Sequence, residues 1–294
     1  MLLSEFIKSG CESLREVYPE REARSIVVAY CCEVFGVQSY THIVEPGTMV
    51  PSELEARALS DLSLLRSGRP LQYVLGYAWF CGRRFKVSDG VLIPRPETEE
   101  MVQKALAFLS GCGEARVLDI CTGSGCIAWS IALGAPGSRV TGVDISPEAL
   151  SVAREQESLL SGEGVSFKAP EFIEADILGQ DWFRGLGQFD VLVSNPPYIC
   201  EEEKARMDRN VLDFEPSLAL FVPDSDPLLF YRAIASAAGE LLRDGGLGIV
   251  EINERFGAGT AELFSSYGFS DATVIQDFNG RDRFVSFSSP HRTP

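Results

Sequence analysis

The sequence predicts an α/β protein, in which a mostly parallel seven-stranded sheet with an antiparallel edge hairpin is preceded by a small helical domain. From about residue 115 onward, short apolar strands alternate with helical segments, which is typical of a parallel sheet covered on both faces. Before residue 72, apolar residues recur only at helical spacing. A length of 294 residues with 45% hydrophobic residues suits about two globular domains.

The expected helical domain covers residues 1–72. Within it, residues 20–36 and 51–68 carry apolar residues every three or four positions, as helices with one buried face do. Pro51 suits a first helical turn, and Gly68 suits the residue after a helix end. We expect the apolar stripes of these helices to form a core.

A short β linker is expected at residues 73–95. The dipeptide Asp89-Gly90 separates two short apolar runs, 85–87 and 91–93, and Asp-Gly between such runs favours a hairpin turn. The sequence therefore predicts a hairpin centred on Asp89-Gly90.

The remaining chain, residues 96–294, is expected to form the sheet domain. Its predicted strands are 117–120, 139–143, 172–174, 189–193, 246–252, 272–277 and 282–287. Its predicted helices are 97–110, 125–133, 147–159 and 226–243. Only a turn with Asn279-Gly280 joins the last two strands, so we expect them to pair antiparallel at one edge.

Composition and charge exclude several classes of protein. The 26 Lys and Arg against 42 Asp and Glu give a net charge of −16, which argues against a strongly cationic nucleic-acid binder. The eight cysteines form no CxxC pair and the histidines are only His42 and His291, so we expect no metal site. The first residues lack the pattern of a signal peptide, and no apolar run reaches about 18 residues. We therefore expect a cytoplasmic protein.

Residues 117–128, VLDICTGSGCIA, combine a buried strand, a glycine turn and a helix start. Gly123 and Gly125 allow close approach of a ligand to the backbone, and the helix that follows presents free N–H groups. Asp144 ends the next strand, about twenty residues on, where an acidic side chain accepts hydrogen bonds from a ribose diol. The pattern predicts a nucleoside-binding turn.

The glycines leave the cofactor open, because Gly123, Gly125 and Ala128 also fit the permissive form of the NAD signature. Asp119, just before the turn, favours S-adenosylmethionine, whose amino-acid part has an ammonium group that NAD lacks. Asp176 follows the third strand, where its carboxylate could accept from the amino group of adenine.

The tetrapeptide Asn195-Pro196-Pro197-Tyr198 follows the fourth strand directly and indicates the reaction. A planar conjugated nitrogen is a poor nucleophile, but an asparagine oxygen and a prolyl carbonyl can together orient one NH2 group and favour charge build-up on it. The prolines keep the backbone rigid and offer no competing N–H, and Tyr198 can pack on the planar group. No general base is required, because a methylated amide nitrogen loses its proton to water.

At these residues the sequence resembles the release factor glutamine methyltransferases (the HemK/PrmC family), which belong to the Rossmann-like class I S-adenosylmethionine-dependent methyltransferases. The resemblance covers nearly the whole chain. It is carried by RPLQY at 69–73, PRPETE at 94–99, residues 119–125, Asp144, NPPY at 195–198, Glu215-Pro216 and GRDR at 280–283. PRPETE with NPPY is more discriminating than NPPY alone, which adenine-N6 DNA methyltransferases share.

The resemblance implies methyl transfer from S-adenosylmethionine to the side-chain nitrogen (N5) of the glutamine in the Gly-Gly-Gln motif of class 1 release factors, with S-adenosylhomocysteine as product. Asn195 and Pro196 would bind the amide, and Tyr198 would pack on it. The expected catalytic residues are Asn195, Pro196, Pro197 and Tyr198. The expected cofactor-binding residues are Asp119, Cys121, Thr122, Gly123, Ser124, Gly125, Asp144, Asp176 and Asn195.

The resemblance also implies that the helical domain, 1–72, helps to grip the release factor. We expect a monomer that binds no nucleic acid directly, and the acidity suggests a partner with basic surface. The chain departs from the family pattern at Cys121, at residues 221–223, and at Asn253 with Phe256.

Three other functions remain open. One is a glutamine methyltransferase acting on a ribosomal protein. It ranks second, after the release factor enzyme, because the PRPETE segment favours the release factor enzyme. An adenine-N6 DNA methyltransferase ranks third, because the chain is acidic and lacks a basic target-recognition region. A non-catalytic partner protein that keeps the cofactor fold ranks last, because binding alone needs no NPPY.

Overall fold

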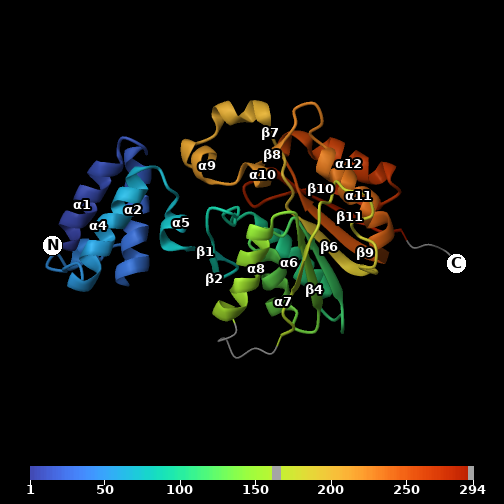
Figure 1. Cartoon of the computed structure of the whole chain (residues 1–294), viewed down its shortest axis with the longest axis horizontal. Helices are drawn as coiled ribbons and strands as arrows, with labels where there is room; N and C mark the ends of the chain where they lie inside the picture. The colour runs from blue at the N-terminus through green and yellow to red at the C-terminus, as the bar shows by residue number, and fades with distance from the viewer. Residues whose placement is uncertain (161–166, 291–294) are drawn as a thin grey trace. The chain divides into compact units, whose positions relative to one another are not determined.

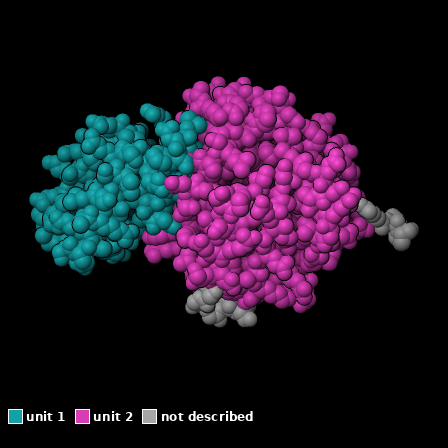
Figure 2. All heavy atoms as spheres, in the orientation of Figure 1, with its two compact units in different colours: residues 1–76, 208–214 teal, residues 77–207, 215–294 magenta. Residues whose placement is uncertain are grey.

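The computed structural model describes residues 1–160 and 167–290 and shows two structural units (Figures 1 and 2). The first contains Met1–Gly76 and Asp208–Phe214, and the second contains Tyr77–Met207 and Glu215–Pro294. The first unit thus extends beyond residue 72 and includes a segment from much later in the sequence. No helix among the described residues is both long enough and apolar enough to span a bilayer.

The first unit is helical, and the two helices expected from the sequence are confirmed. The long helix α2 ends at Gly36, whose φ of 68° lies in the left-handed region that favours glycine. Apolar side chains, including the fully buried Leu3, Tyr30 and Leu65, form its core. Its helices are α1 (Leu3–Leu14), α2 (Glu20–Phe35), α3 (Thr41–Val44), α4 (Ser52–Arg66), α5 (Leu71–Leu75) and α9 (Arg209–Phe214).

A seven-stranded sheet forms the centre of the second unit, as predicted, in the order β10-β11-β9-β6-β3-β4-β5. Strand β11 pairs antiparallel with both β9 and β10, and the other neighbours pair parallel, so the antiparallel hairpin lies at one edge. The strands are β3 (Arg116–Ile120), β4 (Arg139–Asp144), β5 (Glu171–Glu174), β6 (Phe189–Ser194), β9 (Leu242–Glu251), β10 (Ser270–Gln276) and β11 (Asp282–Ser288).

Helices cover both faces of the sheet, because neighbouring strand residues point to opposite sides. In β6, Val191 and Val193 face a core shared with α6 and α7, whereas Leu192 faces a core shared with α11 and α12. The helices of this unit are α6 (Thr98–Leu109), α7 (Cys126–Gly134), α8 (Pro147–Leu160), α11 (Leu229–Leu241) and α12 (Gly257–Ser266). The sequence pattern did not identify α12, which connects β9 to β10.

The predicted hairpin turn at Asp89-Gly90 is wrong. The hairpin is formed by β1 (Tyr77–Phe80) and β2 (Arg83–Lys86), and its turn is Cys81-Gly82. Both turn residues have positive φ, 49° and 74°, as a tight type I′ turn requires. This register buries Phe80 and Phe85 completely in the core with α6 and α7, so burial of two aromatic rings outweighs the local Asp-Gly signal. The hairpin therefore belongs to the second unit.

After β6 the chain leaves the sheet and returns before α11. The excursion begins with β7 (Ile199–Cys200) and ends with β8 (Phe221–Val222), and these strands pair in parallel. Between them lie η1 (Glu201–Arg206), α9 and α10 (Ser217–Leu220). A further short helix, η2 (Glu254–Phe256), follows β9. The pairing of β7 with β8 brings the Glu215-Pro216 segment back toward the end of β6.

Candidate active site

A cavity of about 210 Å³ lies at the carboxyl ends of β3, β4, β5 and β6, where open parallel sheets bind their ligands. The residues that follow these four strands form much of its wall, together with residues from 90–98 and 216–219. The predicted site residues on the wall are Cys121, Thr122, Gly123, Ser124, Asp144, Asp176, Asn195 and Pro197. The other predicted residues, Asp119, Gly125, Pro196 and Tyr198, are not on the wall.

The turn after β3 has the backbone of a ligand-binding loop. Cys121, Gly123 and Gly125 have φ angles of 60°, 54° and 77°, all in the left-handed region. Cys121 therefore adopts a backbone conformation that glycine reaches more easily than other residues do. The buried Gln156, which the sequence did not single out, donates to the carbonyl of Ser124 at 3.1 Å and holds the turn from α8.

Gly125 is constrained by packing as well as by its φ angle. A Cβ atom at this position would lie 3.0 Å from the Cβ of Ala153 and 3.1 Å from Cδ1 of Trp129. The residue immediately precedes α7 and packs against Ala153 and Trp129, and it is absent from the cavity wall.

Asp119 is fully buried behind the turn. Its Oδ2 accepts from Thr122 Oγ1 at 2.5 Å and from the backbone N–H of Ala128 at 3.2 Å. Its Oδ1 has no hydrogen-bond partner among the described residues, and burial raises the pKa of the carboxyl to about 7. A buried acceptor without a partner is costly, and a ligand ammonium group would satisfy it. This unpartnered acceptor thus fits the ammonium group in the amino-acid part of S-adenosylmethionine.

Asp144 and Asp176 occupy different environments on the cavity wall. Asp144 accepts from the backbone N–H of Gly123 at 2.8 Å and of Ser146 at 3.0 Å. Burial raises the pKa of Asp144, and these hydrogen bonds oppose the rise. Its remaining lone pairs suit hydroxyl donors such as a ribose diol. Asp176 is exposed and accepts from the backbone N–H of Leu178 at 2.9 Å.

Several apolar wall residues were missed from the sequence, among them Ile145 and Leu178. Ile145 and Leu178 line the cavity and are both 44% exposed. They follow Asp144 and Asp176 closely in the chain, so their positions next to predicted cofactor-binding residues could have identified them as part of the site. Apolar side chains at this end of the cavity suit a flat aromatic base.

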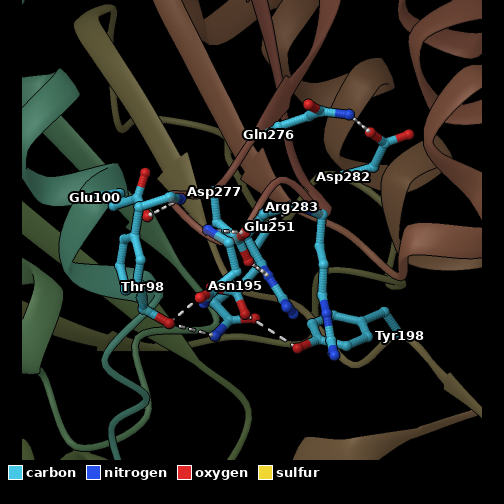
Figure 3. A network of polar contacts seen from close by, with 12 residues as sticks. Thr98, Glu100, Asn195, Tyr198, Glu251, Gln276, Asp277, Asp282 and Arg283 are labelled. Carbon is cyan, nitrogen blue, oxygen red and sulfur yellow. Dashed lines mark hydrogen bonds and ion pairs between the residues drawn. The ribbon is translucent and has the colours of Figure 1, made fainter.

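A buried hydrogen-bond network joins the NPPY tetrapeptide to α6 and β9 (Figure 3). Asn195 Nδ2 donates to Thr98 Oγ1 at 3.4 Å, and Thr98 Oγ1 donates to Glu251 Oε2 at 2.6 Å. The Tyr198 hydroxyl donates to the other carboxylate oxygen, Glu251 Oε1, at 3.0 Å. Burial raises the pKa of both Glu251 and Tyr198. The tyrosine ring is therefore anchored through its hydroxyl.

The backbone after NPPY is held by Asn253, one of the positions that depart from the family pattern. Asn253 Nδ2 donates to the carbonyl of Tyr198 at 3.2 Å and to Glu203 Oε1 at 2.8 Å. Its own side-chain oxygen accepts from the backbone N–H of Arg255. Neither Asn253 nor Glu251 was predicted as a site residue, although both lie at or just beyond the end of a predicted strand.

The segments that carried the resemblance come together beside the cavity. Arg95 donates to Glu215 Oε1 at 2.7 Å, and the backbone N–H of Ile93 donates to Glu215 Oε2 at 3.1 Å. Glu215 is buried, so this pair fastens the PRPETE segment to the Glu-Pro segment. Pro94, Arg95, Thr98 and Pro216 all line the cavity with Asn195. Residues of the predicted nucleoside-binding turn and of the NPPY tetrapeptide thus line one cavity.

Comparison with known proteins supports this interpretation. A family model described as a methyltransferase domain matches residues 113–234. The release factor glutamine methyltransferase of Bacteroides thetaiotaomicron is 42% identical over 276 residues, covering 94% of this chain and 96% of its own length. That of Chlorobaculum tepidum is 39% identical and covers 92% of this chain and 91% of its own. The solved hMettl16 catalytic domain matches with a TM-score of 0.54 at 15% identity, covering 81% of each chain, and shows the fold alone.

Proposed function

Because this chain belongs to the release factor glutamine methyltransferase family, we propose that it methylates the side-chain amide nitrogen of the glutamine in the Gly-Gly-Gln motif of class 1 release factors. The observation that carries the proposal is the position of Asn195. Its amide stands on the wall of the cavity that the nucleoside-binding turn also lines. A methyl donor and a planar nitrogen can therefore meet there.

The cofactor is S-adenosylmethionine, and when bound it supplies an electrophilic methyl group on a sulfonium. We assign the ribose hydroxyls to Asp144 and the ammonium group to the buried Asp119. Residues 121–125 would hold the cofactor with their backbone, and Ile145 and Leu178 would enclose the adenine beside Asp176. The partnerless oxygen of Asp119 and the cavity-facing carboxylate of Asp144 support this assignment.

Asn195 and Pro196 orient the substrate nitrogen. The glutamine amide has a delocalised lone pair, so it attacks only if the nitrogen can begin to develop positive charge. Two acceptors, Asn195 Oδ1 and the carbonyl of Pro196, would each accept a hydrogen bond from the substrate NH2 group and stabilise that charge. Pro196 and Pro197 offer no backbone N–H to compete for these acceptors. The N-methylated amide then loses its proton to water, and no side-chain base is needed.

Tyr198 acts through its ring in this account. Its hydroxyl is already committed to Glu251, which leaves the ring face to pack on the planar amide.

The partner and location follow from the same reaction. We propose that the protein acts in the cytoplasm as a monomer, on free release factor and without direct contact to nucleic acid. The helical residues 1–72 are proposed to recognise the release factor. The net charge of −16 supports a basic protein partner, because opposite charges accelerate encounter.

The direct test offers several acceptors side by side. Purified protein and methyl-labelled cofactor are incubated with a class 1 release factor, with ribosomal proteins, or with adenine-containing DNA. We expect label only in the release factor, and Asn195→Ala should abolish it while retaining cofactor affinity in calorimetry. Label in a ribosomal protein or in DNA, with none in the release factor, would replace the proposal by that alternative.

A further inference from the structure

The hydrogen bonds that end at Asn195 have a fixed direction. An ionised carboxylate only accepts hydrogen bonds, so the two hydroxyls on Glu251 must both donate to it. Burial and the charge of Glu97 raise the pKa of Glu251, whereas donation from the side chains of Thr98 and Tyr198 and the positive charge of Arg283 oppose that rise and stabilise the ionised form. Glu251 therefore determines where the hydroxyl proton of Thr98 points.

The direction of the bond between Thr98 and Glu251 also fixes the direction of the bond between Thr98 and Asn195. Thr98 has a single hydroxyl proton, and Glu251 Oε2 receives it at 2.6 Å. Thr98 Oγ1 is then only an acceptor toward Asn195, so the asparagine must present its NH2 group there, as it does at 3.4 Å. The side-chain oxygen of Asn195 is left on the other side of the amide.

The orientation of the amide decides which substrate Asn195 can bind. With Oδ1 free, it accepts from an NH2 group, whereas a flipped amide would present its own NH2 to the substrate NH2. An amide that can rotate would spend part of its time in the second, repulsive orientation. Thr98 itself lines the cavity beside Asn195, and Glu251 lies behind it with 1% of its surface exposed.

We propose that Thr98 and Glu251 are positioning residues that lock the Asn195 amide with its oxygen available to the substrate, and so select substrates that offer an amide NH2. This inference rests on the proposed function and adds residues to it. Figure 3 shows the three side chains converging from α6, from the end of β6 and from the end of β9. The same carboxylate accepts from Tyr198, so one buried group holds both NPPY side chains to which a substrate contact is assigned.

The test replaces the Thr98 hydroxyl by a methyl group of similar size. For Thr98→Val we expect kcat for release factor methylation to fall by roughly 10- to 100-fold, in line with the about hundredfold cost of a 1 Å misplacement. The calorimetric Kd for S-adenosylhomocysteine should change little, because the Thr98 hydroxyl bonds to Glu251 and Asn195 and to none of the residues assigned to the ribose, the ammonium group or the adenine. Thr98→Ser, which retains the hydroxyl, should restore most of the rate.

Thr260→Val is the matched control. Thr260 is a fully buried threonine of α12, and its hydroxyl has no hydrogen-bond partner among the described residues. Its replacement also removes a buried hydroxyl, but outside the cavity, so we expect kcat to equal that of the wild type.

A second variant changes Glu251, the acceptor at which the hydrogen bonds from Asn195 through Thr98 end. Glu251→Gln offers one acceptor oxygen in place of two, so Thr98 or Tyr198 must lose its acceptor. We expect a fall in kcat comparable to that of T98V, and the double variant should be no slower than the slower single variant, since both break the same chain.

The outcomes separate this inference from the proposed function. If the wild-type protein does not methylate release factor, the function is wrong. If it does, but folded T98V keeps its kcat or T98S fails to recover it, the positioning role is wrong. If T98V does not fold, Thr98→Ala decides, because it also removes the hydroxyl, and an unchanged kcat there overturns the inference.

Discussion

Replacement of Tyr198 by phenylalanine tests whether the Tyr198 hydroxyl stabilises the fold or takes part in the reaction. The variant keeps the ring but removes the O–H that donates to Glu251 Oε1 at 3.0 Å. Glu251 is buried and, among the described residues, retains Thr98 as its remaining side-chain hydroxyl donor. Hydrogen bonds to charged groups contribute about 1.5–3 kcal/mol, so we expect the free energy of unfolding to fall by about 2 kcal/mol.

The measurement can be restricted to the second unit, because all three tryptophans, Trp79, Trp129 and Trp182, lie in it. Urea unfolding followed by tryptophan fluorescence therefore reports on this unit. For a unit of its size, a loss of about 2 kcal/mol corresponds to a fall in Tm of roughly 4–8 °C. The kcat should fall by no more than about tenfold, a barrier change of about 1.4 kcal/mol.

The effect should depend on pH in a defined direction. Burial raises the pKa of Glu251, and donation from Tyr198 opposes that rise. Without the hydroxyl the pKa in the folded state rises further, so the folded variant holds its proton to higher pH than the folded wild type. The stability deficit of the variant should therefore grow as pH rises through that pKa and shrink below it. Unchanged stability together with abolished kcat would refute this reasoning and give the hydroxyl a chemical role.

Three further predictions concern the cofactor turn, its ribose acceptor and the partner. Asp144→Asn can accept through one side-chain oxygen only, so S-adenosylhomocysteine should bind about tenfold more weakly in calorimetry, and an unchanged Kd would contradict the ribose assignment. Gly125→Ala at φ 77°, with its Cβ 3.0 Å from that of Ala153, should lower the unfolding free energy by about 1–3 kcal/mol in urea, and a neutral result would refute the packing argument. The KM for release factor should rise with salt as the screening length falls from about 30 Å to about 8 Å, and a flat profile would remove long-range attraction as its cause.

The parts of the fold that sequence predicts well are those specified locally. Alternating strands and helices, the turn at 121–125 and the NPPY tetrapeptide each depend on neighbouring residues, and the structure has them in place. Even the unusual Cys121 adopts the φ expected at a glycine position.

The features that sequence missed depend on contacts between distant residues. The hairpin turn lies at Cys81-Gly82 and not at Asp89-Gly90, and the observed register buries Phe80 and Phe85. The segment 208–214 belongs to the first unit although more than a hundred residues separate it from the rest.

The same reason accounts for the missed site residues. Thr98 and Glu251 are 153 positions apart, and their hydrogen bond exists only after β9 is placed beside β6. Nothing in the local sequence around Glu251 marks it as part of a site. Thr98 lies within the PRPETE segment, but its partner and the direction of its hydrogen bond cannot be read from that segment.

The most direct test of the central claim is tandem mass spectrometry of the release factor's Gly-Gly-Gln peptide after reaction with wild-type protein and labelled cofactor. We predict one added methyl group, located on the side-chain nitrogen of that glutamine and absent when Asn195→Ala replaces the wild type. A methyl group on any other atom, or an unmodified glutamine after reaction with active wild-type protein, would contradict the assignment of Asn195 and its cavity to glutamine methylation.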